Sequence, residues 1–403
     1  MALRSLENSR NHGHSCVGRA GITLRRQRTG EPGHDVASHG ASWHDSRRSA
    51  LRGERGQTLI LFVVSLPLLV AIIALVADGS NLFANKRSVQ NVADASVLAA
   101  VKELNPCFGS GSVVACTSNV QAVATDYCER NGGRDATPPC SVTSPSSPLP
   151  ACNDSSGLDP NSCYKTPYPG PSDYGVQVRI RRDVSLNFGG FLGLPSSPVR
   201  AKAAASLGLP GGATNVSPVG VQQQIAACTM PSAPVKCFGP SYPTTLDFDS
   251  GGFGYALLNL HCATDTPAST CPSNPTSNAT EMNLYMTSGF PGTLAVNKWY
   301  VQNNGVKNGI KQGVDDVIAS GKALLIPVYD CVSITPPAVI CGAGTGNPAA
   351  YKVIGYAAFV ITSRNGWNNG QGHTFTGYFT QYFATGISGG GTDFGVHVVT
   401  MTE

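Results

Sequence analysis

The sequence predicts an α+β protein: a single N-terminal transmembrane helix that continues into a long second helical stretch, then a β-rich extracytoplasmic region ending in a β-sandwich-like module. Three observations support this. Residues 59–77 are apolar and contain no charge. Residues 79–104 contain no proline and place apolar residues three, four and seven positions apart. From residue 174 onward, short runs of alternating apolar residues are separated by Gly, Pro and Asn clusters, which is typical of strands.

The charge is unevenly distributed along the 403 residues. Residues 1–56 contain ten Arg, no Lys and five acidic residues, a net charge of +5, so the formal total of +4 leaves −1 for the rest of the chain. A nucleic-acid-binding domain would spread positive charge over a folded surface, so we expect no nucleic acid as a partner. We interpret residues 1–56 as a disordered, basic cytoplasmic tail, because they show almost no apolar periodicity.

The apolar segment from Leu59 to Ala77 has the length of a membrane span. Nineteen residues at 1.5 Å each reach about 28 Å, close to the thickness of the hydrocarbon layer. Pro67 interrupts its middle, which membrane helices tolerate with a kink. The alternative is a secretory signal peptide cleaved near Ala77, but such a signal has a shorter apolar region and a shorter basic leader. We therefore expect one span and the lipid bilayer as a partner.

Flanking charges and cysteines predict the orientation of the span. Four arginines precede it and two basic residues follow it closely, which places the N-terminus in the cytoplasm: Arg47, Arg48, Arg52 and Arg55 before, Lys86 and Arg87 after. Twelve of the thirteen cysteines follow the span, which favours an oxidising exterior. Their short gaps suit disulfides between neighbours, namely Cys107/Cys116, Cys128/Cys140, Cys152/Cys163, Cys228/Cys237, Cys262/Cys271 and Cys331/Cys341. Zinc is the rival explanation, but no C-x-x-C or H-x3-5-H spacing supports it.

Helical character continues beyond the span, through residue 104. An apolar stripe of mostly small residues follows this segment, and Asn105-Pro106 is expected to end the helix; the stripe comprises Leu82, Val89, Ala93, Ser96, Val97, Ala100 and Leu104. Two interpretations are open. The stripe can pack in the core of this chain, or it can form an assembly face against a neighbouring subunit.

Residues 55–100 carry a recognisable combination of motifs. The span with its central proline is flanked by Arg55-Gly56-Gln57 and by Asp78-Gly79, and the helix contains Gln90-Asn91-x-Ala93-Asp94. This segment resembles the N-terminal part of the Flp pilus-assembly TadG-like proteins of the tight-adherence (Tad) system. The resemblance implies a pseudopilin-like, single-pass protein of the bacterial inner membrane that assembles or anchors a pilus, is no enzyme, and contacts other Tad/Flp subunits through the helix of residues 79–104.

This chain departs from the family pattern at two points. Pilins of this class are cleaved after a glycine and carry Glu at the fifth mature position. Counted from Gly56, that place is Leu61, which argues against processing between Gly56 and Gln57. Larger relatives also carry a D-x-S-x-S metal motif. The three partial matches in this chain have Leu where the last Ser must stand, so we expect no metal and no cofactor; they begin at Asp78, Asp94 and Asp154.

The region after the helix is predicted in two parts. Residues 105–210 form a disulfide-stapled loop and strands that pack on the helix; residues 174–188 alternate except at Arg182, and residues 199–207 alternate again. Residues 211–403 form an all-β module with runs near 244–248, 255–261, 322–334, 351–363, 375–384 and 394–401, and one helix over residues 306–320.

The sequence also contains features of functions other than pilus assembly. The alternative is a membrane-anchored adhesive module that binds a glycan or surface ligand, because Tyr, Trp and Asn are frequent from Trp299 to Tyr382. Gly386-Ile387-Ser388-Gly389-Gly390 fits G-x-S-x-G, the pattern of a hydrolase nucleophile. A nucleophile elbow requires a helix after the strand, whereas a glycine run and another strand are expected here. Each exterior histidine stands alone in the sequence. We therefore expect no catalytic residue.

Overall fold

The structure is a computed structural model. It describes residues 57–108, 112–140, 148–153, 161–170, 173–233, 236–248, 254–271, 278–303, 308–342, 348–366 and 373–402. The predicted tail of residues 1–56, which includes Arg55 and Gly56, lies outside these ranges. The chain divides into a unit of residues 1–65, of which the start of the first helix is described, and a unit of residues 66–403 that contains all the other elements.

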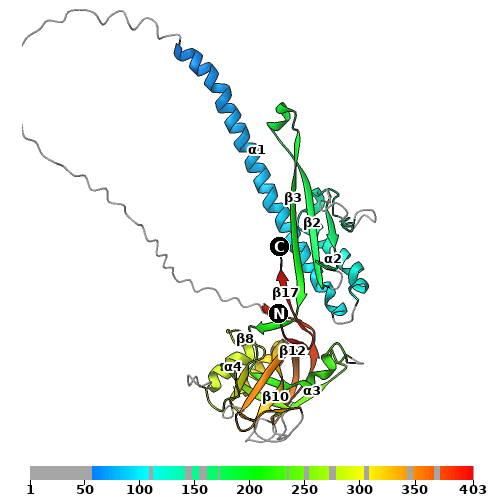
Figure 1. Ribbon diagram of the computed structural model, residues 1–403, viewed down its shortest axis with the longest axis vertical. Coiled ribbons are helices and arrows are strands. Elements are labelled where there is room, and N and C mark those ends of the chain that lie inside the picture. The colour runs from blue at the N-terminus through cyan, green and yellow to red at the C-terminus, as the bar shows by residue number, and fades with distance from the viewer. Residues whose placement is uncertain are drawn as a thin grey trace, which may run out of the picture. The chain divides into compact units, whose positions relative to one another are not determined.

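The first helix, α1, spans Gln57–Ala100 and contains Pro67 (Figure 1). A 3₁₀ helix, η1 (Val101–Cys107), continues directly from it. The sequence predicted regular helix up to residue 104. The proline at 106 has no N–H and disfavours α geometry at the residue before it, which accounts for the tightening of the last turns into 3₁₀ geometry.

The second half of α1 packs on a five-stranded sheet with the order β1-β2-β3-β17-β14. Its strands are β1 (Cys163–Lys165), β2 (Gly175–Ser185), β3 (Ser196–Gly208), β14 (Tyr382–Phe383) and β17 (Val396–Met401). The two long strands form the antiparallel hairpin that the alternation predicted, in register from Gly175 opposite Ser206 to Ser185 opposite Ser196. β17 pairs with β3, and β14 pairs with β17, so two strands from the predicted C-terminal module belong to the sheet beside α1.

One core holds α1, the hairpin and the short helices together. Helix α2 (Thr117–Arg130) contributes Val120 and Ala124 to the apolar cluster that also contains the α1 stripe and the inner faces of β2 and β3. The short 3₁₀ helices η2 (Val113–Cys116) and η3 (Gly133–Asp135) flank α2. The strands of the hairpin and the long helix therefore share one apolar cluster.

The β-rich region beyond residue 210 contains a small closed barrel. Strand β10 (Ala323–Ser333) pairs with β5 (Val219–Gln222), β5 with β7 (Tyr255–Thr264), β7 with β9 (Trp299–Gln302), β9 with β12 (Ala350–Asn365), and β12 pairs back with β10. This closure differs from the predicted sandwich. The long strands β10 and β12 pair through two register shifts, and such irregularities bend and twist a sheet enough to close it.

Short strands complete the β-rich region. β11 (Ile340–Cys341), β13 (Thr374–Thr380), β6 (Thr244–Asp247) and β16 (Thr392–Asp393) extend the barrel sheet, while β4 (Pro210–Ala213), β8 (Leu294–Ala295) and β15 (Gly386–Ser388) form a separate three-stranded sheet.

This region is not all β. Helix α5 (Lys311–Ser320) was predicted from the sequence, whereas α4 (Ala279–Ser288) and the short α3 (Gln223–Ala226) were not. The side chain of Asn278 accepts a hydrogen bond from the backbone N–H of Glu281 at 2.9 Å and caps α4. The Asn-x-x-Glu spacing is a helix-start signal that sequence reasoning missed.

Disulfide bonds connect cysteines that are neighbours along the chain. The structure contains bonds Cys107–Cys116, Cys128–Cys140, Cys152–Cys163, Cys228–Cys237, Cys262–Cys271 and Cys331–Cys341. Each closes a short loop, and the first joins η1 to η2 at the end of the long helix. The thirteenth cysteine, Cys16, lies outside the described residues.

Candidate functional site: the helix–hairpin interface

The first half of α1 exposes its apolar side chains. Among the described residues, one helical segment, Leu59–Cys107, is long and apolar enough to cross a membrane, and the apolar window within it is not buried by the rest of the chain. The large side chains from Leu59 to Val76 are all exposed, and Ala77 ends the apolar run. A stretch of this kind is stable when lipid covers it, so the helix fits a single-pass membrane protein.

The second half of α1 buries its apolar stripe inside this chain. Side chains of the predicted stripe are fully covered, and Leu82 is partly covered; the covered set is Val89, Ala93, Ser96, Val97, Ala100 and Leu104, with Val92 beside them. They meet Val176, Val178 and Ile180 of β2 and the small residues Ala201, Ala203 and Ala205 of β3. The structure therefore supports the intramolecular interpretation of the stripe. Contacts of the 79–104 helix with other subunits would have to use its outer face, where Leu98 is exposed.

Asp78 connects the edge of the span to the hairpin turn. Its carboxylate is buried and accepts three backbone hydrogen bonds, from the N–H groups of Asn187 at 2.8 Å, Phe188 at 3.0 Å and Gly189 at 2.8 Å. Three N–H groups directed at one carboxylate form an anion nest, and hydrogen bonds to an ionised acceptor are stronger than neutral ones. The structure thus gives Asp78 of the motif a definite role, which is to hold the β2–β3 turn against α1.

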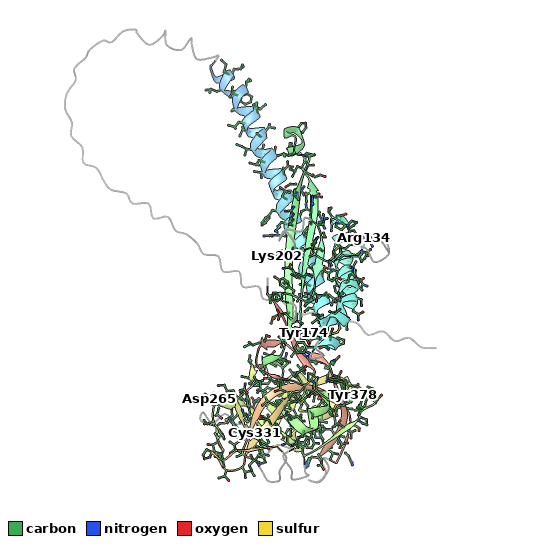
Figure 2. All side chains as sticks on the ribbon, turned by 45° about the vertical axis from the view of Figure 1, so that its right-hand side comes forward. Arg134, Tyr174, Lys202, Asp265, Cys331 and Tyr378 are labelled. Atoms are coloured by element: carbon green, nitrogen blue, oxygen red, sulfur yellow. A yellow bond between two sulfur atoms is a disulfide. The ribbon has the colours of Figure 1, made fainter. Side chains whose placement is uncertain are left out.

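Polar contacts continue this attachment along the helix. Asn81 Nδ2 donates to the carbonyl of Ser185 at 3.3 Å, and Lys86 Nζ donates to the carbonyl of Arg200. Gln90 Nε2 donates to the carbonyl of Lys202 at 3.1 Å (Figure 2 labels Lys202 on the hairpin). Helix positions therefore meet successive positions of the hairpin, with the turn nearest Asp78.

The remaining motif residues fall into different environments. Gln90 also donates to Asp94 Oδ1 at 2.8 Å, which fixes both side chains on the hairpin side. Ala93 is fully buried in the core, while Asn91 is exposed. A Cβ added at Gly79 would meet nothing within 4 Å, so packing within the described chain does not explain a glycine there. Arg55 and Gly56 lie outside the described residues, and no side-chain contact of Gln57 is described.

Arg182 explains the break in the strand alternation. Its guanidinium donates to the carbonyl of Gly132 at 2.6 Å, to Asn85 Oδ1 at 3.3 Å and to Ser88 Oγ at 3.4 Å. One side chain thereby joins the hairpin to α1 and to the turn after α2. The sequence shows only the irregularity, which is a charged residue at a position where the alternation requires an apolar one.

A polar cluster lies on the β-rich region. His261 Nε2 is 2.9 Å from both Glu281 Oε1 and the Tyr285 hydroxyl, and the hydroxyl donates to Glu281 at 2.8 Å. Burial tends to raise the pKa of Glu281, but hydrogen bonds from Tyr285 and His261 outweigh it and lower that pKa. Burial, together with Glu281, raises the pKa of Tyr285 to about 12. His261 was expected to stand alone, and the structure instead gives it two partners.

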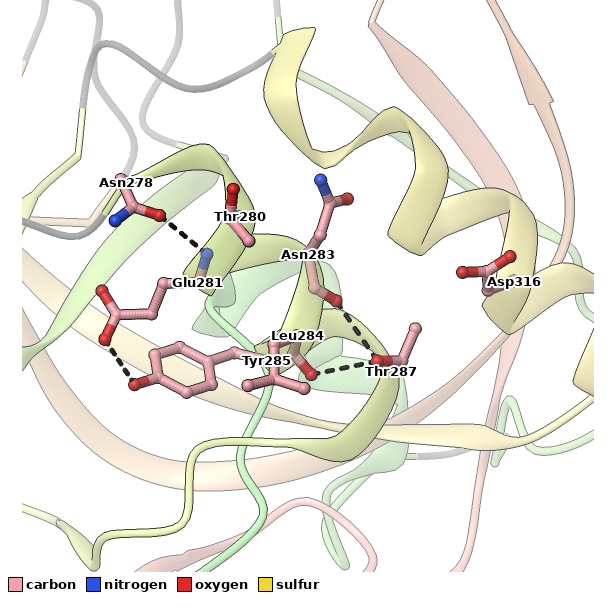
Figure 3. Close-up of a pocket in the computed structure, with 8 residues that line it drawn as sticks. All are labelled: Asn278, Thr280, Glu281, Asn283, Leu284, Tyr285, Thr287 and Asp316. Carbon is pink, nitrogen blue, oxygen red and sulfur yellow. Dashed lines mark hydrogen bonds between the residues drawn. The ribbon is translucent and has the colours of Figure 1, made fainter.

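This cluster borders an open depression of about 880 Å³ (Figure 3). The depression is lined by Asn278, Thr280, Glu281, Asn283, Leu284, Tyr285, Thr287 and Asp316. Its polar groups largely bond to one another, as in the contacts of Thr287 with the carbonyls of Asn283 and Leu284. The arrangement therefore holds α4 in place.

The sequence features that suggested a hydrolase or a metal site do not form such a site in the described residues. Ser388 lies in β15, which is followed by β16 and not by a helix, so the G-x-S-x-G match is not a nucleophile elbow. Within the described ranges, no group of three or more His, Cys, Asp or Glu side chains is arranged to hold a metal ion. Among the three partial D-x-S motifs, Asp154 lies outside the described residues.

Most aromatic residues that suggested a ligand surface are in the core. The buried set between positions 299 and 379 comprises Trp299, Tyr300, Tyr329, Tyr351, Tyr356, Phe359, Phe375 and Phe379. Tyr382 is exposed and Tyr378 is partly exposed, whereas Trp367 lies outside the described residues. Sheet packing accounts for the buried aromatics.

The fold and this interface define the class of protein: an apolar helix that fits a single membrane span, attached at the C-terminal end of its apolar run to a hairpin of an α+β region. Residues 56–103, about an eighth of the chain, match the model of the family described as putative Flp pilus-assembly TadE/G-like. The match confirms the resemblance predicted from residues 55–100. No curated protein and no solved structure matches the chain.

Proposed function

We propose that this protein is a non-catalytic, single-pass component of a Tad/Flp-type pilus-assembly system, which assembles or anchors the pilus at the bacterial inner membrane. The observation that carries the proposal is the family match over residues 56–103, the segment that contains both the exposed apolar run and the Asp78 attachment. A helix with one end suited to lipid and the other packed on a folded region is the arrangement that anchoring requires.

The proposed orientation has the N-terminus in the cytoplasm and residues 79–403 outside. Two independent features support it. Arginines outnumber other charges immediately before the span, as expected on the cytoplasmic side. The six disulfide bonds all follow the span, and disulfides persist in oxidising compartments.

Gene deletion in the source bacterium tests the proposal. Surface Flp pili are counted by electron microscopy in the deletion strain and after complementation with the intact gene. Loss of pili that the intact gene restores supports a role in assembly or anchoring. Unchanged pili and unchanged adhesion in the deletion strain would refute it.

Matched variants connect the function to the helix–hairpin interface. Complementation with Asp78→Ala, which removes the acceptor of three backbone hydrogen bonds, is expected to restore fewer pili. Asp265→Ala removes an exposed carboxylate on the β-rich region and is expected to restore pili fully. Both variants must be present in the membrane at the level of the unmodified protein. If the two variants restored equal numbers of pili at equal amounts in the membrane, the helix–hairpin interface would not be required for the function.

A further inference from the structure

The turn of the β2–β3 hairpin is apolar and exposed. We call residues 186–195 the hairpin tip; it includes the 3₁₀ helix η5 (Gly189–Leu192). Residues 184–199 contain no charged residue, and Phe188, Phe191 and Leu194 are 38%, 88% and 60% exposed. A soluble surface rarely gathers large apolar side chains on one small projecting turn without a partner to cover them.

The hairpin tip is fixed at the edge of the apolar span. Asp78 directly follows Ala77, the last residue of the apolar run, and binds the backbone of Asn187, Phe188 and Gly189. The contact of Asn81 with Ser185 holds the adjoining end of β2 against the next turn of α1. Figure 1 shows the hairpin running beside α1. The tip therefore stands at the level where the helix leaves the hydrocarbon layer.

The backbone of the tip is suited to a lipid environment. Backbone groups in lipid must find partners within the protein, because no water is there to bond them. In the tip, the N–H of Leu186 bonds to Pro195, that of Phe191 to Phe188, and that of Leu194 to Gly189, at 2.9–3.1 Å. Gly193 N–H bonds to Gly190 at 3.2 Å, and Asp78 accepts three more. Seven N–H groups of this ten-residue turn thus have acceptors inside the protein.

Basic side chains lie just beyond this level. Lys86 and Arg87 on α1 and Arg200 on β3 are exposed, and the Arg87 guanidinium stacks over the Phe83 ring at 4.5 Å from its centroid. Eight or nine helical residues separate Lys86 and Arg87 from Asp78, a distance of about 12–14 Å along the axis. Long basic side chains at that distance can reach the phosphates of lipid head groups, which attract them.

We propose that the hairpin tip inserts into the outer interface of the same membrane that α1 spans, with Phe191 and Leu194 among the acyl chains and the nearby basic side chains at the phosphates. Aromatic and aliphatic side chains on one face with cations beside them are the chemistry of interfacial membrane attachment. The inference rests on the proposed membrane span. Its effect is to fix the orientation of the extracytoplasmic region relative to the bilayer, because one helix alone leaves that region free to tilt.

Spin-label depth measurements on the full chain test the inference. The protein, in a Cys16→Ser background, is reconstituted in vesicles of phosphatidylcholine and phosphatidylglycerol, and single labels are placed through Phe191→Cys, Leu194→Cys, Val114→Cys and Leu68→Cys. Val114 is the matched control, because it is an exposed apolar residue (74%) on η2, outside the tip. Leu68 lies in the apolar span. The measurement is the ratio of label accessibility to oxygen, which concentrates in lipid, over a water-soluble nickel complex.

The inference predicts a ratio several-fold higher at positions 191 and 194 than at 114, and highest at 68. A lipid-type ratio at 68 with the same aqueous ratio at 191, 194 and 114 would overturn the tip insertion and leave the membrane span intact. An aqueous ratio at 68 would refute the span itself. Protection at 191 from both reagents, with spin–spin broadening that grows with the protein-to-lipid ratio, would assign the tip to a second copy of this chain and overturn the lipid assignment.

Discussion

The Asp78 attachment gives the most specific prediction about stability. Asp78→Ala removes the carboxylate that accepts hydrogen bonds from the N–H groups of Asn187, Phe188 and Gly189. Leu186 and Leu194 would keep their own backbone bonds within the turn. The variant is therefore expected to release the hairpin tip from α1 while the core between helix and sheet stays folded.

The size of the effect follows from the three bonds. Hydrogen bonds to a charged acceptor contribute about 1.5–3 kcal/mol each, but they are not additive within one group. We expect the free energy of opening the tip to fall by about 2–4 kcal/mol, which corresponds to amide exchange faster by roughly thirtyfold to several hundredfold at about 1.4 kcal/mol per factor of ten.

Hydrogen–deuterium exchange of the full chain in lipid nanodiscs measures this change. The peptide that covers residues 186–195 should exchange faster in Asp78→Ala, and Asp78→Asn should give a smaller increase because its amide oxygen remains an acceptor. Asp94→Ala, on the same helix but bonded to Gln90, serves as the control and should leave this peptide unchanged. Unchanged exchange of the tip in Asp78→Ala would refute the assignment of Asp78.

Further predictions concern the rest of the molecule. Replacing the first disulfide through Cys107→Ser with Cys116→Ser should lower the free energy of unfolding by about 3 kcal/mol, since the bond closes a short loop; chemical denaturation measures it. Val92→Ala, in the covered stripe, should cost about 2 kcal/mol, whereas Leu98→Ala on the exposed face should cost little in the same assay. Burial raises the pKa of Tyr300 to about 12, so the folded state keeps a proton that the unfolded chain loses near pH 10. The contribution of Tyr300 to the free energy of unfolding is then complete below pH 10 and falls by up to about 3 kcal/mol as pH rises to 12. Tyr300→Phe should reduce that fall, and a free energy of unfolding that falls equally steeply with pH in the variant would contradict this.

Elements defined by local patterns were predictable from the sequence. The charge-free apolar run and the helical spacing after it predict α1, and alternation broken only at Arg182 predicts β2 and β3 within a few residues. Helix α4 was not predicted, because its apolar residues have weak helical spacing. Asn278 and Glu281 nevertheless have the spacing that is typical of a helix start. These patterns concern neighbouring residues, which is why the sequence displays them.

Features that depend on distant contacts could not be predicted. Asp78 and Asn187 are 109 positions apart, and no local pattern connects an acid at the end of a span to the turn of a hairpin. The closing contact of the barrel between β10 and β12, and the pairing of β17 with β3, likewise depend on which strand edges are free after folding. Arg182 lies between these cases, because its position was visible as an irregularity while its three partners were not.

The pairing of β17 with β3 has a consequence for the proposed anchor. The segment that matches the pilus-assembly family cannot cover its own apolar stripe, because a single helix has no second layer. β2 and β3 supply that layer, and β17 then binds the open edge of β3 through Val399 opposite Leu207 and Met401 opposite Ala205. The chain from β4 to β16, apart from β14, is thus inserted between two neighbouring strands of the sheet that holds the helix. Attachment at both ends of the insertion restrains its motion more than a single linker would, which is the property expected of a module held at a membrane anchor.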